Sequence, residues 1–374
     1  MRSDSVVVLG RRFHHVWLRD NCLCGDCREA GSFQKTVDLG QISGAGAVRR
    51  VEVSDEVLYL EWDEVPEHSS TFPIEWLLAH AYDPPGEEDG ESVELWDAKD
   101  WELSPPRWHR LDDADPGGGE WADDLARYGF VLLDGVSEAS LDKFAARIGP
   151  IFETEFGHVT VVQSSPDATD LALSGAELSV HTDFSPHMHT PPLLQFMLCV
   201  EHDATGGDSI LVDGFKAAED LRRESPDKFG RLVRIPINFQ QFYADREFFH
   251  QRQRPILEVD PSGSVSGVFF AHSHAANWRL PPDEVTEYYD AYHAFFDYLK
   301  DPARQFRLRL GAGQCIALQN GRLLHGRTAY DPRSGGRTLI TEFVAWEYFS
   351  ARRRFHRQRR WYADPREAGQ HVRG

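Results

Sequence analysis

The amino-acid sequence predicts a mainly β protein with flanking helices, whose larger part is a β-barrel or jelly roll. Segments with strand character outnumber helical ones after residue 120, and they do not alternate with helices as in a doubly wound sheet. The chain has 374 residues, a length that suits one large domain with a smaller companion. We expect an N-terminal domain over residues 1–85, a linker over 86–119 and the barrel domain over 120–374.

The N-terminal region has the pattern of short strands and turns. The stretch VRRVEVSDEVLYLEW alternates on either side of Ser54 and Asp55, which predicts a β-hairpin. FPIEWLLAHAY predicts a short helix that is entered through Pro73. The following stretch, Asp83–Gly119, is rich in Pro, Gly, Asp and Glu, and this composition is typical of a linker. We expect the Trp-bearing middle segment of this stretch to be docked against the rest of the protein.

The larger domain begins with the pattern of a helix and a buried strand in EWADDLARYGFVLLDGV, and EASLDKFAARIGP predicts a second helix. Helical patterns recur at Phe215–Arg223 and Asp283–Tyr298, and the C-terminal SARRRFHRQRRWYADPREAG predicts a basic helix with a solvated face. The predicted strands of this domain are LLQFMLCVEH, DSILVDG, SGVFFAH, GQCIALQNGRLLHG and TLITEFVAWEYF.

The net charge limits the classes of partner. It is −20 at pH 7, which disfavours binding to nucleic acid or to anionic membranes. No apolar run approaches the roughly 18 residues that a membrane helix needs. The N-terminal MRSDSVVVLGRRFHHVW lacks the pattern of a signal peptide. We therefore expect a cytoplasmic protein without nucleic-acid or membrane partners.

Three of the five cysteines, Cys22, Cys24 and Cys27, lie within NCLCGDC. A disulfide framework spreads and pairs its cysteines, whereas this close spacing is typical of metal ligands. A tetrahedral zinc ion needs a fourth ligand, and the candidates are His14, His15, His68 and His80. Because four protein ligands close the coordination shell, we expect a structural zinc ion.

The stretch SVHTDFSPHMHTPP contains a His-x-Asp pair, His181 and Asp183. Side chains two residues apart on a strand or at its exit point the same way, so this pair can bind adjacent positions of one metal ion. His325, in QNGRLLHGR, is the candidate third ligand. Two imidazoles and one carboxylate are the ligands of non-haem Fe(II), and they leave positions open. Arg337, on the next predicted strand, is suited to hold the far carboxylate of a dicarboxylic co-substrate.

These motifs and TGGDSILVDGF resemble the Fe(II)/2-oxoglutarate dioxygenases of the taurine dioxygenase superfamily. WLRDNCLCGDC and EHSSTF narrow the resemblance to the γ-butyrobetaine hydroxylase and trimethyllysine hydroxylase branch, and the likeness runs from about Trp17 to Arg359. The resemblance implies a double-stranded β-helix core with an N-terminal zinc domain, a small-molecule substrate, 2-oxoglutarate, O₂ and a homodimer. It also implies hydroxylation of an unactivated C–H bond, with desaturation or dealkylation as alternatives.

The resemblance assigns roles to individual residues. It makes His181, Asp183 and His325 the iron ligands and His68 the fourth zinc ligand. Arg337 becomes the anchor of the 2-oxoglutarate C5 carboxylate. The other residues in the matching co-substrate stretches are Ser209, as a hydroxyl partner of that carboxylate, and Arg327 and Asn320. For the last two, binding of the co-substrate and hydrogen bonding to local backbone both stay open.

The predicted substrate pocket departs from the family pattern. The betaine hydroxylase encloses a trimethylammonium group with tyrosines and a tryptophan, because electron-rich rings attract a cation. The matching positions here are Phe156, Thr160, Leu173, Phe184 and Phe343, and His158 is a further candidate for the wall. No tyrosine hydroxyl remains at these positions. The sequence therefore predicts a more apolar pocket for a small amino-acid-like or betaine-like molecule.

Two other functions compete with this one. A sensor that binds a small molecule without turnover could use the same fold, although it has no need of an open iron site beside an arginine. Oxygenation of protein or nucleic acid is disfavoured by the net charge. His187 and His189 follow the predicted ligand strand, and we expect supporting or loop roles for them rather than metal binding.

Overall fold

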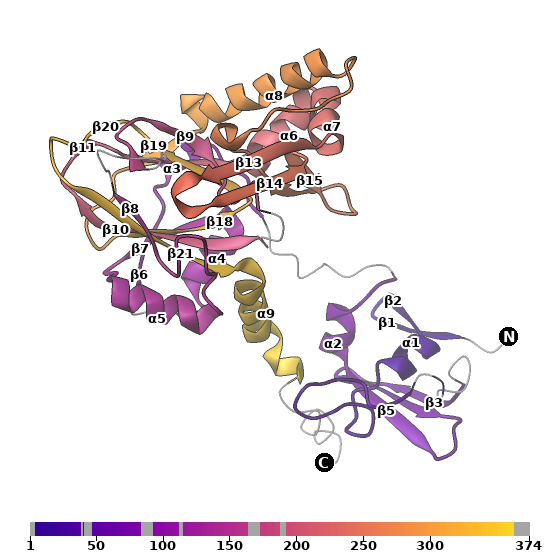
Figure 1. The fold of residues 1–374 in the computed structure, drawn as a ribbon. Coiled ribbons are helices and arrows are strands. Elements are labelled where there is room, and N and C mark those ends of the chain that lie inside the picture. The colour runs from indigo at the N-terminus through magenta and orange to yellow at the C-terminus, as the bar shows by residue number, and fades with distance from the viewer. Residues whose placement is uncertain are drawn as a thin grey trace. The chain divides into compact units, whose positions relative to one another are not determined.

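The computed structural model divides the chain into two units (Figure 1). One comprises Met1–Glu91 with Arg354–Gly374, and the other comprises Ser92–Arg353. The structure describes residues 4–38, 40, 47–83, 93–111, 115–163, 173–187 and 192–362. Among them, no helix is both long enough and apolar enough to cross a membrane.

The first unit is small and rich in β structure. Its elements are β1 (Ser5–Val8), β2 (Arg11–His14), α1 (His15–Asp20), β3 (Val48–Val53), β4 (Val57–Trp62), β5 (His68–Pro73) and α2 (Ile74–Ala79). The hairpin expected about Ser54 and Asp55 is confirmed, because β3 and β4 pair antiparallel across that turn. The helix expected after Pro73 is confirmed as α2. A compact core that includes Phe13, Trp62 and Phe72 holds these elements together.

The second unit contains the larger sheet and most of the helices. Its helices are α3 (Ala98–Leu103), α4 (Glu120–Tyr128), α5 (Glu138–Ile148), α6 (Gly214–Glu224), α7 (Pro226–Arg234), α8 (Val285–Lys300) and α9 (Trp346–Tyr362), the last of which runs on past the end of the unit. Its strands are β6 (Trp108–Arg110), β7 (Phe130–Asp134), β8 (Thr160–Gln163), β9 (Leu178–His181), β10 (Leu193–His202), β11 (Thr205–Gly206), β12 (Ser209–Asp213), β13 (Ile237–Tyr243), β14 (Phe248–Arg254), β15 (Leu257–Val259), β16 (Val265–Val268), β17 (Phe306–Leu308), β18 (Cys315–Asn320), β19 (Leu323–Arg327), β20 (Tyr330–Asp331) and β21 (Arg337–Ala345).

Within the described residues, ten of these strands form one sheet. The order β17-β12-β19 continues through β18-β10-β21-β8, with β9 paired to β19 and β7 paired to β18. The β18–β19 contact is limited to Asn320 opposite Leu323, so the sheet consists of two halves joined at this point. The mainly β fold with flanking helices that the sequence predicted is confirmed.

Alternation along the strands separates an inner face from a helix-covered face. On β10, Leu194, Phe196 and Leu198 pack in the core formed with α4 and α5. Met197 and Cys199 point to the other face and belong to a different core. Side chains two residues apart on a strand share a face, so the odd-numbered residues of β10 line the inside of the barrel. Both faces are covered, which explains the nearly continuous apolar runs in the sequence.

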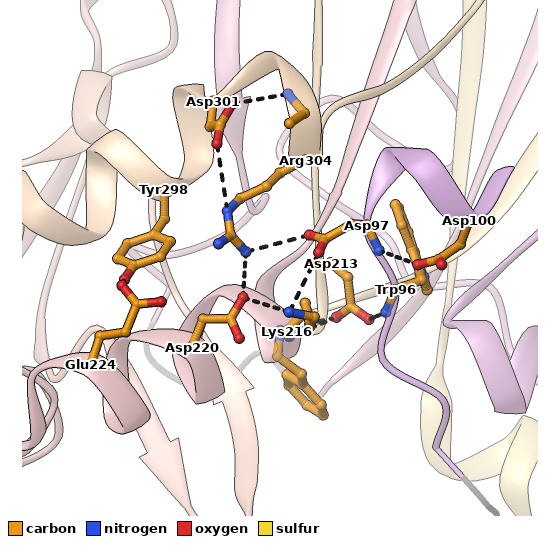
Figure 2. A network of polar contacts seen from close by, with 12 residues as sticks. Trp96, Asp97, Asp100, Asp213, Lys216, Asp220, Glu224, Tyr298, Asp301 and Arg304 are labelled. Carbon is orange, nitrogen blue, oxygen red and sulfur yellow. Dashed lines mark hydrogen bonds and ion pairs between the residues drawn. The ribbon is translucent and has the colours of Figure 1, made fainter. Parts of the chain in front are cut away.

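The segment that was expected to be part of a linker is built into the second unit. Trp96 is buried in the inner core, and β6 pairs with β7. Asp97 joins a network in which Lys216 of α6 and Arg304, shortly after α8, both also bind the carboxylate of Asp220 (Figure 2). The burial of the indole and these ion pairs explain why a Pro- and Gly-rich stretch is nevertheless held against the barrel.

The end of the last strand differs from the expectation. TLITEFVAWEYF was predicted as strand throughout, but β21 ends at Ala345 and α9 begins at Trp346. The helix places Trp346 and Phe349 one turn apart, with ring centroids 4.8 Å from each other. Phe349 also packs on Trp121 of α4. These contacts bury the aromatic residues that an extended strand would carry beyond the core.

Glu342 is a buried carboxyl group on the helix-covered face of β21. The residue is fully buried, and none of the described residues donates a hydrogen bond to either oxygen of its carboxyl group. Burial, together with the nearby carboxylates of Asp142 and Glu138 and against an opposing effect of His158, raises the pKa of Glu342 to about 7. The folded protein therefore holds this group in its neutral form more strongly than the unfolded chain does.

We predict that Glu342 makes the stability of the protein decrease with rising pH. A raised pKa in the folded state gives stability that is fully present below the unfolded pKa of 4.5 and is lost as the pH rises through about 7. The loss amounts to about 3 kcal/mol. In Glu342→Gln, the difference between the free energies of unfolding in urea at about pH 5 and about pH 8 should shrink by this amount. The same difference in both proteins would contradict the prediction.

Candidate functional site

Two antiparallel strands bring His181 and His325 together. In the pairing of β9 with β19, His325 lies opposite His181, and the two ring centroids are 4.5 Å apart. The strands approach closely at Gly326, where a Cβ atom would lie 2.6 Å from the carbonyl oxygen of Leu178. A glycine is therefore needed between His325 and Arg327 for β9 to pack against β19.

Asp183 completes a cluster of three possible metal ligands. Its Oδ1 lies 3.4 Å from His181 Nε2, and its Oδ2 lies 3.6 Å from His325 Nε2. One ligand atom from each of the three residues lies within 4.8 Å of the others. The carboxylate comes from the turn directly after β9, two residues beyond His181, which is the geometry expected from the His-x-Asp spacing.

The protonation states suit metal binding. The Nδ1 of His181 lies 2.9 Å from the carbonyl oxygen of Ser179, so Nδ1 donates and Nε2 presents its lone pair to the cluster. Burial lowers the pKa of His325 to about 4, which keeps its imidazole neutral. Burial would raise the pKa of Asp183, but His325 and His181 lower it below its usual range. Two neutral imidazoles and one carboxylate fit the donor set of non-haem Fe(II).

Two amide side chains position Asp183. Asn320 accepts a hydrogen bond from the Asp183 backbone N–H at 2.9 Å and donates one to the Asp183 carbonyl oxygen at 3.1 Å. Of the two roles left open for Asn320, the structure therefore displays the backbone contact. Gln195 Nε2 donates to Asp183 Oδ2 at 2.8 Å from the facing strand β10. Gln195 was not among the predicted site residues, although a single amide within an apolar strand is a signal that points to it.

A pair of buried arginines lies beyond His325. Arg337 Nε donates to the carbonyl oxygen of Gly207 at 3.1 Å, and Arg327 donates to the carbonyl oxygens of Ser174 and Ala176. Both guanidinium groups contact the ring of Tyr330, with their carbons 4.9 Å (Arg327) and 5.5 Å (Arg337) from its centroid. The sequence did not predict a role for Tyr330 at this site.

The electrostatics of this pair favour an anion. Burial lowers the pKa of Arg337, and the nearby charge of Arg327 lowers it further. None of the described carboxylates forms an ion pair with Arg337. Ser209 is buried on β12 opposite Arg327, close in the sheet to the same pair. A dicarboxylate such as 2-oxoglutarate would supply the missing negative charge, so the residues present fit this co-substrate.

Aromatic side chains form a wall next to Asp183. Phe184 makes edge-to-face contacts with Phe343 at 4.9 Å and with Phe152 at 6.0 Å between ring centroids. Phe343 lies on β21 opposite Gln195, the residue that hydrogen-bonds Asp183. The structure thus brings Phe184 and Phe343 together beside the metal cluster, and adds Phe152.

The other predicted wall residues lie in different settings. Phe156 packs against Tyr243 of β13, with ring centroids 5.4 Å apart. Thr160 is half-buried on β8, and Leu173 is half-buried just before β9. His158 is half exposed and bonds Asp142 of α5 at 2.9 Å, so its ring is engaged at the surface.

His187, which follows the cluster in the chain, is not part of it. His187 Nε2 lies 3.0 Å from Gln241 Oε1, and its ring contacts that of Phe184. His189 lies outside the described residues. The hairpin of β13 and β14, which supplies Gln241, had no recognisable motif in the sequence.

The cysteine cluster of the first unit has the geometry of a zinc site. His68 Nε2 lies 3.3 Å from the Sγ of Cys22, 3.9 Å from that of Cys24 and 3.5 Å from that of Cys27. In a tetrahedral site with ordinary Zn–S and Zn–N bond lengths, these separations are about 3.6 Å. The cluster therefore fits a closed shell of three thiolates and one imidazole.

The other candidate histidines have different partners. His80 Nδ1 lies 2.7 Å from the carbonyl oxygen of Trp76, and His14 Nδ1 lies 2.9 Å from the hydroxyl of Tyr82. His15 is buried, and this burial lowers its pKa. Among the described histidines, His68 is the one that the structure brings to the three thiols.

A barrel that carries two imidazoles, a carboxylate and a nearby buried arginine defines the class of mononuclear non-haem metal oxygenases. Comparison with known families agrees. Residues 89–341 match the taurine catabolism dioxygenase TauD, TfdA family, and residues 10–78 match the gamma-butyrobetaine hydroxylase-like N-terminal family.

Individual relatives match over most of their length. A gamma-butyrobetaine dioxygenase of Pseudomonas sp. (strain AK-1) is 34% identical over 87% of this chain and 85% of its own. The human gamma-butyrobetaine dioxygenase is 29% identical over 92% of this chain and 91% of its own. A trimethyllysine dioxygenase of Meyerozyma guilliermondii is 28% identical over 91% of this chain and 89% of its own. Among solved structures, a taurine dioxygenase from Burkholderia xenovorans covers 68% of this chain and 90% of its own at 16% identity, with a TM-score of 0.47.

The chain belongs to the taurine catabolism dioxygenase TauD, TfdA family. It is an Fe(II)- and 2-oxoglutarate-dependent dioxygenase, and it carries a cluster of three cysteines and one histidine that fits structural zinc. The family that the sequence resembled is thereby confirmed.

We predict that Cys27→Ser lowers the zinc content and the stability of the first unit. Loss of one thiolate opens a closed shell, and structural zinc contributes directly to folding free energy. The zinc-to-protein ratio measured by metal analysis should fall, and the thermal unfolding midpoint should drop by several degrees. Cys199→Ser, a buried thiol of the barrel, is the control and should keep the zinc. Full zinc occupancy in Cys27→Ser would exclude Cys27 as a ligand.

Proposed function

We propose that the protein oxidises an unactivated C–H bond of a small amino-acid-like or betaine-like molecule at an iron ion held by His181, Asp183 and His325. The observation that supports this most is the open cluster of their three ligand atoms beside the buried, unneutralised guanidinium of Arg337. When bound, Fe(II) supplies the O₂ activation that couples decarboxylation of 2-oxoglutarate to oxidation of a C–H bond.

The protein side of the reaction is positioning. Asn320 and Gln195 fix the backbone and the carboxylate of Asp183, so that this ligand is held before iron binds. Arg337 would bind the C5 carboxylate of 2-oxoglutarate, with Ser209 as its hydroxyl partner. Arg327, whose guanidinium contacts the same Tyr330 ring, would strengthen the positive potential. These contacts orient the co-substrate and leave room for substrate and O₂.

The aromatic wall would choose the substrate. Phe184 and Phe343 present apolar rings next to Asp183, and Phe156 lies farther along the same region. Such rings exclude water from the reacting bond and attract cations weakly through their faces. Thr160, Leu173 and His158 remain predicted members of the pocket. The homodimer and the cytoplasmic location also remain predictions.

One screen tests the proposed function. The purified protein with Fe(II), 2-oxoglutarate and ascorbate is incubated with a metabolite extract, and mass spectrometry follows succinate and new products. A product heavier by one oxygen supports hydroxylation, and a product lighter by two hydrogens indicates desaturation. Iron-loaded protein that forms no succinate with any candidate would favour the non-catalytic binding protein instead.

We predict that Asp183→Ala abolishes iron-dependent turnover. The variant removes the only carboxylate of the cluster, so both the iron-to-protein ratio and succinate formation should fall to background. Asp142→Ala changes an exposed carboxylate that pairs with His158, and it serves as the control with unchanged iron content. Substantial turnover by Asp183→Ala would refute the ligand assignment.

We predict that Arg337→Ala raises the KM for 2-oxoglutarate by on the order of 10- to 100-fold. This range corresponds to the loss of a charge-assisted hydrogen-bonded contact of about 1.5–3 kcal/mol. Arg333→Ala is the control. Arg333 lies shortly before Arg337 in the chain and its side chain is 90% exposed, so this variant should leave the KM unchanged. An unchanged KM in Arg337→Ala would remove this residue from the co-substrate site.

A further inference from the structure

Glu155 is a buried carboxylate with unused hydrogen-bonding capacity. Its side chain is only 6% exposed. Its Oε1 accepts a hydrogen bond from Gln241 Nε2 at 3.0 Å and lies 3.7 Å from His187 Nε2. Its Oε2 is buried, and no donor among the described residues reaches it. A buried carboxylate oxygen without a donor is costly, so the arrangement implies a partner that binds there.

The group is ionised in spite of its burial. Burial alone would raise the pKa of Glu155, but the nearby imidazoles of His187 and His250 lower it below its usual value. Arg246 donates from Nη1 to the Glu155 backbone carbonyl oxygen at 2.6 Å, and its guanidinium carbon lies 4.6 Å from the Phe156 ring centroid. Gln241 is already engaged, because Nε2 also contacts the hydroxyl of Tyr243 at 2.6 Å and Oε1 lies 3.0 Å from His187 Nε2.

The carboxylate lies next to the aromatic wall. His187, the neighbour of Glu155, makes an edge-to-face contact with Phe184 at 4.9 Å between ring centroids. Phe184 directly follows Asp183 and contacts Phe343. On the other side, Phe156 follows Glu155 in the chain and packs on Tyr243. Glu155 therefore sits among the rings that begin at the metal cluster.

We propose that Glu155 binds the cationic nitrogen of the substrate, and that this nitrogen carries at least one N–H. The inference deepens the proposed function and rests on it. An ammonium or guanidinium N–H would donate to the vacant Oε2 while its charge balances the carboxylate. A fully methylated ammonium has no N–H and would leave Oε2 without a donor. Within amino-acid-like and betaine-like molecules, the site thus favours protonated amines over quaternary ammonium compounds.

Matched pairs of ligands test this preference. The probes are a series of ω-(dimethylamino) carboxylic acids and dimethylalkylamines of increasing length, each paired with its N-trimethyl counterpart. The two members of a pair differ in one N–H replaced by one N–CH₃. Dissociation constants are measured calorimetrically without O₂, with the full chain loaded with Fe(II) and 2-oxoglutarate, so that binding is read without turnover.

For the wild-type protein we expect the N–H member of the best pair to bind at least 10-fold more tightly than its trimethyl partner. In Glu155→Gln this preference should disappear, mainly through a loss of 10- to 100-fold in affinity for the N–H member. Glu153→Gln, an exposed neighbour, is the matched control and should keep the wild-type preference. Glu155→Asp retains the negative charge and should keep part of the preference for the N–H member. It provides a second variant if Glu155→Gln folds poorly.

Several results would overturn the inference. These are tighter binding of the trimethyl members by the wild-type protein, an equal loss for both members in Glu155→Gln, or no binding of any probe. The affinity for 2-oxoglutarate is measured in the same samples. If 2-oxoglutarate binds normally, such a result removes only the role of Glu155, whereas absent 2-oxoglutarate binding would contradict the proposed function itself.

Discussion

The pairing of β9 with β19 is the constraint on which the candidate site depends. Its register sets His325 opposite His181, and the Asp183 carboxylate lies 3.4 Å from His181 Nε2 and 3.6 Å from His325 Nε2. A slip of one residue would turn His325 toward the helix-covered face, because strand side chains alternate. β19 is buried along its whole length, so burial of its apolar residues strongly fixes this register. The closest approach of the two strands requires the glycine at position 326.

Buried ionic groups whose pairing within the protein is incomplete explain where ligands would bind. Arg337 is buried beside a second arginine and has no carboxylate partner among the described residues, and Glu155 retains one oxygen without a donor there. Burial of an ion is costly unless a counter-charge compensates it. A dicarboxylate at the arginines and a protonated amine at Glu155 would each supply that counter-charge.

The two clusters of possible metal ligands differ in a way that matches their settings. The thiols and His68 are sufficient to surround a tetrahedral ion, and they tie together loops of a small unit with a limited core. The cluster of His181, Asp183 and His325 has three ligands and therefore leaves coordination positions for other molecules. It also sits in a larger barrel, where Asn320 and Gln195 hold the carboxylate in place.

The sequence by itself determined the fold class, the family, the three thiols of one cluster and the pair His181 and Asp183 of the other, because metal ligands need particular side chains at short spacings and strands alternate with period two. Only the tertiary structure decided which histidine joins the thiols, that Asn320 contacts the backbone of Asp183, and that Glu155 meets Gln241. Glu155 and Gln241 are 86 residues apart in the chain. Such contacts arise from the packing of a hairpin against the barrel, and no local spacing encodes them.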